Sequence, residues 1–90
     1  MTTAERIGAH LKRLDADEFD AMQKYLAALG DLESICAAGL DAGYEEVRFA
    51  CRKATDLGLQ LEQASRIGEA VRCAYVETGH LDALTGKVIQ

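Results

Sequence analysis

A chain of 90 residues with 49% hydrophobic and 28% charged residues has the composition of one small folded domain. The absence of proline and tryptophan, together with 6% aromatic residues, excludes polyproline and collagen-like structures and disfavours a strand-rich sandwich. Ten basic against fifteen acidic residues give a net charge of −5, which disfavours binding to nucleic acid or to anionic membranes.

Apolar residues at helical intervals predict a first short helix over residues 3–14. Thr2, followed three residues later by Glu5, is typical of a capping box at its start. Asp15 repeats this type of start signal and predicts a second, longer helix, in which Gly30 interrupts the apolar stripe and is a candidate position for a bend.

Gly39 is expected to end the second helix in the left-handed conformation. The hydrophobic contact that accompanies such a stop would join Leu40 to Ile35. Phe19, Met22, Leu26, Leu29, Cys36 and Leu40 fall on one side of this helix, and we expect that side to face the core.

A turn at residues 41–43 precedes a third predicted helix over residues 44–57, which Gly58 is expected to end. Apolar spacing resumes over residues 61–75 with its stripe displaced by about a quarter turn, at about 100° per residue. This displacement predicts a separate fourth helix or a marked bend. Gly79 is expected to end this segment, and residues 80–90 form a C-terminal tail.

The fold class is therefore predicted as all-α, a compact bundle of four to five helices in a single domain spanning residues 1–90. Alanine-rich faces permit close helix packing but supply little apolar volume. We expect a homodimer to supplement so thin a core.

Three cysteines without a CxxC pair argue against a disulfide framework and indicate reduced thiols. The N-terminus shows no basic leader followed by an apolar run, and no stretch reaches the roughly 20 apolar residues that a membrane helix needs. A cytoplasmic location without membrane association is the expectation.

Catalytic and metal chemistry find little support in the sequence. The only imidazoles are His10 and His80, and no family-type signature surrounds Cys73, so a catalytic thiol is disfavoured. Glu77 and His80 have the spacing found in di-iron bundles, but only one copy of the motif is present. We therefore expect a protein that is not an enzyme and that uses no metal or cofactor.

One local pattern resembles a known family. The segment Ala64-Ser-Arg-Ile-Gly68, followed by Val76-Glu-Thr-Gly79, is similar to the helix-turn-helix of small phage-type repressors. The resemblance implies a turn at Gly68 and a recognition helix carrying Arg72, with Arg66 beside it, directed toward bases or phosphates.

The acidic residues are concentrated in the first half of the chain. Residues 15–45 contain eight acidic residues against Lys24 alone. A helix dipole accounts for acids in a first turn, but it does not account for those further along the chain. The acids predicted to bind a partner are Asp15, Asp17, Glu18, Asp20, Asp31 and Glu33.

Phe49 is the residue most at odds with its surroundings. It points about 160° away from the apolar stripe of its helix, among charged side chains, which is typical of a contact with another helix or a partner. Arg48 and Arg52, spaced at i and i+4, flank it and are candidates to receive carboxylates of another chain.

These features predict a non-enzymatic, acidic, helical protein-interaction module that binds a basic site on another protein. Size and charge are those of a small bacterial or phage-borne regulator or inhibitor, similar to the class of acidic anti-CRISPR proteins. The alternative is a helix-turn-helix DNA-binding regulator. Binding to duplex DNA at low salt separates the two hypotheses.

Overall fold

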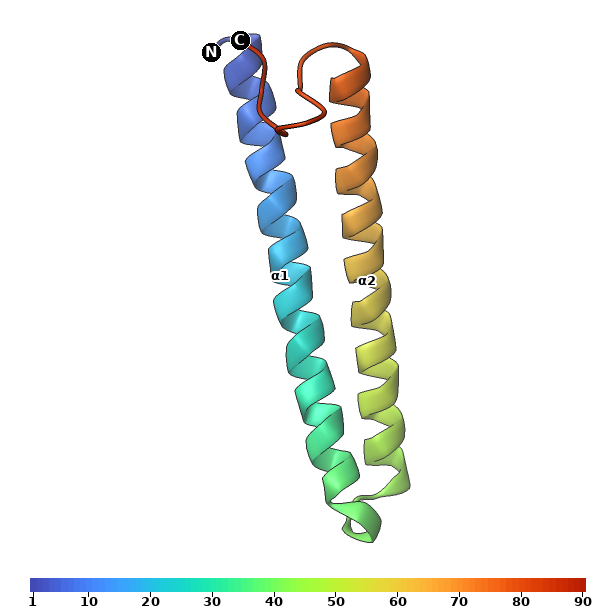
Figure 1. The fold of residues 1–90 in the computed structure, drawn as a ribbon. Helices are drawn as coiled ribbons and strands as arrows, with labels where there is room; N and C mark the ends of the chain where they lie inside the picture. The colour runs from blue at the N-terminus through green and yellow to red at the C-terminus, as the bar shows by residue number, and fades with distance from the viewer.

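The computed structural model describes all residues 1–90 and consists of two long antiparallel helices (Figure 1). α1 spans Thr3–Ala37 and α2 spans Tyr44–Glu77, and the 3-10 helix η1 at Gly39–Asp41 lies in the connection between them. The molecule measures 59 × 20 × 19 Å. The prediction of an all-α fold is confirmed, but the compact bundle of four to five helices is wrong, because an extended helical hairpin takes its place.

A single seam joins the two helices, and its buried and half-buried residues recur at alternating intervals of three and four. On α1 the seam comprises Ala4, Ile7, Leu11, Leu14, Glu18, Ala21, Tyr25, Ala28, Leu32 and Ile35. On α2 it comprises Val47, Ala50, Ala54, Leu57, Leu61, Ala64, Gly68, Val71 and Tyr75. This strict seven-residue repeat is that of an antiparallel coiled coil.

The helices continue through the positions where the sequence predicted ends or a bend. Asp15 and Gly30 lie inside α1, and Gly58 lies inside α2. A glycine in a helix lowers stability by only about 1 kcal/mol relative to alanine. Packing along the continuous seam stabilises the helix by more than this. At Gly58 the missing side chain makes room instead, because a Cβ there would lie 3.0 Å from Cε1 of Tyr25.

The predicted helix-turn-helix is also not formed. Residues 64–77 belong to one unbroken helix, and Gly68 is a buried seam residue rather than a turn. Arg72, the expected recognition residue, forms an ion pair with Asp15 of α1. Arg66 forms an ion pair with Glu62 at 2.6 Å.

Three end signals are confirmed. The amide of Glu5 donates to the Thr2 hydroxyl at 3.2 Å, which caps α1. Gly39 follows α1 with φ 61°, and Gly79 follows α2 with φ 79°, the left-handed conformation that glycine adopts without strain. The predicted contact between Leu40 and Ile35 is wrong, because the Leu40 side chain is fully exposed.

The C-terminal tail folds back over the open end of the hairpin, near the N-terminus (Figure 1). Leu81 is buried there, and it pairs with Val88 in an antiparallel bridge. The Asp82 carboxylate accepts a hydrogen bond from the amide of Leu84 at 2.8 Å, so Asp82 starts a turn. Beside the tail, Nδ1 of His10 and the hydroxyl of Tyr75 lie 2.7 Å apart and join the two helices.

Candidate functional site

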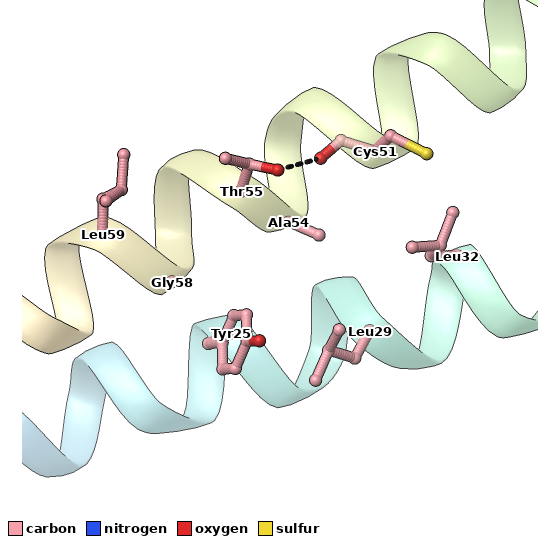
Figure 2. Close-up of a pocket in the computed structure, with 8 residues that line it drawn as sticks. All are labelled: Tyr25, Leu29, Leu32, Cys51, Ala54, Thr55, Gly58 and Leu59. Carbon is pink, nitrogen blue, oxygen red and sulfur yellow. Dashed lines mark hydrogen bonds between the residues drawn. The ribbon is translucent and has the colours of Figure 1, made fainter.

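Two grooves flank the seam, one on each side of the hairpin. They form because the two helices meet only along the seam, so the residues beside the seam stay exposed. The tyrosine groove, of about 470 Å³, is drawn in Figure 2. Its lining comprises Tyr25, Leu29 and Leu32 of α1 and Cys51, Ala54, Thr55, Gly58 and Leu59 of α2. The Tyr25 ring lies beneath Gly58, whereas Leu59 points away from α1 (Figure 2).

Next to the tyrosine groove, α1 exposes a row of large apolar side chains, which we call the apolar flank. The apolar flank comprises Phe19, Met22, Leu26 and Leu29, of which 62%, 40%, 52% and 37% respectively is exposed. The sequence correctly grouped these residues on one side of a helix but assigned that side to the core. The seam occupies the neighbouring face, about a quarter turn away, and leaves the apolar flank in solvent.

The opposite side of the seam holds the Phe49 groove, of about 350 Å³. Its lining comprises Ala28, Asp31, Ser34 and Ile35 of α1 and Glu46, Phe49, Ala50 and Lys53 of α2. The Phe49 side chain is 71% exposed, so it lies outside the core of the hairpin, as its helical position indicated. Asp31 and Glu46 reach this groove from different helices, and neither forms an ion pair within the chain.

A smaller hollow of about 250 Å³ lies on the other side of Phe49, lined by Glu45, Arg48, Phe49 and Arg52. Phe49 therefore lines two hollows of mixed charge: Asp31 and Glu46 outnumber Lys53 in the groove between the helices, whereas Arg48 and Arg52 outnumber Glu45 in the hollow on α2. The structure thus places three of the predicted partner-binding residues, Asp31, Arg48 and Arg52, in hollows that the fourth, Phe49, also lines.

The other predicted acids are distributed around α1. Asp15 pairs with Arg72, and Asp20 pairs with Lys24 at 3.0 Å. Glu18 lies half-buried in the seam, near the backbone of Gly68.

Asp17 and Glu33 are exposed. By helical position, Asp17 lies on the side of the Phe49 groove and Glu33 on the side of the tyrosine groove. The six acids therefore occupy different faces of the helix instead of one patch.

Sequence reasoning missed both grooves, because a groove requires knowing which two helix segments are paired. The seven-residue repeat was the signal that would have paired them. No group of three or more His, Cys, Asp or Glu side chains is arranged to hold a metal ion, and the three cysteines are unpaired and exposed. Neither helix contains a stretch that is both long enough and apolar enough to span a membrane.

No protein-family model, curated protein or solved structure matches this chain.

Proposed function

We propose that this chain is a non-enzymatic protein-interaction module that binds a basic segment of another protein in the Phe49 groove and thereby regulates that protein. The observation that carries the proposal is the exposure of Phe49 in a groove where Asp31 and Glu46, from two different helices, outnumber the one cation, Lys53. Exposed aromatic residues in concave surroundings are the side chains that most often dominate binding energy at protein interfaces.

The chemistry of the groove favours a cationic side chain from the partner. A lysine or arginine would place its charge between Asp31 and Glu46 and its alkyl stem or guanidinium plane against the Phe49 ring. Residues 15–45, which carry eight acids against one lysine, would attract such a partner before contact at low ionic strength.

The experiment starts with capture of the partner on immobilised chain from a lysate of the source cells and continues with purified components. Phe49→Ala is expected to weaken binding at least about tenfold, mainly through faster dissociation. Asp31→Asn combined with Glu46→Gln is expected to slow association at low salt, because these substitutions remove steering charges.

Two matched variants control for nonspecific effects. Leu84→Ala removes an exposed apolar side chain of the tail, and Glu69→Gln removes an exposed charge far from the groove. Both should bind the partner with unchanged kinetics. Equal binding by Phe49→Ala and the unmodified chain, or salt-dependent binding of the unmodified chain to duplex DNA, would contradict the proposal.

A further inference from the structure

The hairpin exposes more surface than a chain of its mass requires. Its accessible surface is 6742 Å², whereas a compact monomer of 9.7 kDa exposes about 5,100 Å². The excess is about 1,600 Å² for each chain, and twice that excess falls within the 2,000–5,000 Å² buried by many obligate homodimers. A second copy of the chain would therefore supply the burial that one hairpin lacks.

The apolar flank is the surface suited to such a contact. The row from Phe19 to Leu29 has no charged member, and it continues into the tyrosine groove. On its α2 side, Met22 borders a hollow that Glu18, Glu62 and Arg66 also line, and Glu62 and Arg66 are paired with each other. Beyond its ends α1 carries Lys12 and Asp15 on one side and Glu33 on the other, all exposed, and Asp15 already pairs with Arg72 of the same chain.

The spacing of these residues makes the flank complementary to itself. Lys12, Phe19, Leu26 and Glu33 follow one another at intervals of seven residues and therefore share one face of α1. When a second copy runs antiparallel with Leu26 opposite Phe19, the next residue of the series at each end is Lys12 opposite Glu33. Both ends of the contact thus pair opposite charges around an apolar centre.

We infer that two copies of this chain form a homodimer through the apolar flank, with their α1 helices antiparallel and Lys12 of each copy facing Glu33 of the other. The two-fold axis passes beside Met22, and each residue meets the same surface on the other copy, as a two-fold interface requires. The resulting four-helix assembly leaves the Phe49 groove of each copy open, so dimerisation and partner binding are independent.

Sedimentation of the full chain at micromolar concentrations is expected to give twice the mass of one chain. Leu26→Glu places a charge in the apolar centre of the interface and should raise the dimer dissociation constant at least about 100-fold. Phe49→Glu introduces the same charge on the other side of the seam and should change the dimer dissociation constant by less than about twofold.

A charge exchange tests the antiparallel register. Glu33→Lys should raise the dissociation constant several-fold at low salt, because two lysines then face each other at each end. Adding Lys12→Glu to the same chain should restore the dissociation constant to nearly its original value, because opposite charges then face each other again.

Oxidative cross-linking gives a readout that does not depend on the folding of the Leu26→Glu variant. In a chain whose three cysteines are changed to serine, Met22→Cys should yield a covalent dimer, whereas Ala27→Cys, on a different face of α1, should not. A mass of one chain at every concentration, a Leu26→Glu dimer as stable as the original, or failure of Lys12→Glu to rescue Glu33→Lys would overturn the inference.

Discussion

The glycines inside the two helices differ in their surroundings: some face open space and others face a side chain. A Cβ at Gly30 would meet nothing within 4 Å, whereas a Cβ at Gly58 would press on the Tyr25 ring. At Gly68 the added atom would lie 2.8 Å from Nη1 of Arg72, the end of a flexible side chain. The helical glycines are therefore spacers at the seam or open positions, and none of them ends a helix.

The first prediction compares two of these glycines. Gly30→Ala should raise the free energy of unfolding by about 0.5–1 kcal/mol, because alanine loses less backbone entropy in a helix. Gly58→Ala should gain less than this or lose stability, because the Tyr25 ring must shift by a few tenths of an ångström. Urea unfolding of both variants at one protein concentration measures the difference, and a larger gain at Gly58 would contradict the packing described.

At the scale of the elements, the sequence predicted helical structure, both helix stops and the start of α1, since these depend on local hydrogen bonding at Thr2, Gly39 and Gly79. It failed at Gly30 and Gly58, where pairing with the other helix overrides a weak local signal. Alanines and a glycine occupy much of the seam, so the apolar flank, with larger side chains, presented the stronger hydrophobic stripe. The position of Phe49 away from the seam was predictable because it depends on helical position alone. Its exposure was not, because the sequence left open that another helix of the chain covers it.

The second prediction concerns the small residues of the seam. Ala54 is 5% exposed at the contact between the helices. Ala54→Leu should therefore lower the free energy of unfolding by about 1–3 kcal/mol through overpacking. Ala27→Leu adds the same side chain at an exposed position of α1 and should change stability by less than about 0.5 kcal/mol. Urea unfolding at matched concentrations compares them, and equal effects would show that the seam tolerates larger side chains.

The third prediction concerns the tail as an element. Leu81 is 4% exposed, and its amide donates to the Tyr75 carbonyl at 3.1 Å, which anchors the tail at the end of α2. Leu81→Ala should lower stability by about 2–5 kcal/mol if the site cannot collapse, and it should expose the tail to proteases at Lys87. Leu84→Ala, in the same tail but almost fully exposed, is the control and should resist trypsin like the unmodified chain. Unchanged protease resistance of Leu81→Ala would mean that other contacts hold the tail.

At the scale of the whole molecule, shape determines what the chain is able to bind. Its radius of gyration is 18.6 Å, whereas a compact domain of this length has about 12 Å. Only six of its 90 residues are buried, so most side chains of both helices are available for contacts with other molecules. A rod with two unlike flanks has room for both contacts that we propose, a second copy on the apolar flank and a basic partner at the Phe49 groove.

The last prediction follows from placing the two-fold axis beside Met22, close to the middle of α1. Two hairpins that pair about this axis lie side by side, with an offset below about 10 Å at 1.5 Å per helical residue. One hairpin has a long axis of 59 Å. Small-angle X-ray scattering should therefore give the dimer a maximum dimension less than about 10 Å greater than that of the Leu26→Glu monomer. The cross-section should roughly double at the same time, because four helices replace two. An end-to-end dimer would instead nearly double the length and leave the cross-section unchanged, and that result would place the contact at the hairpin tips rather than along α1.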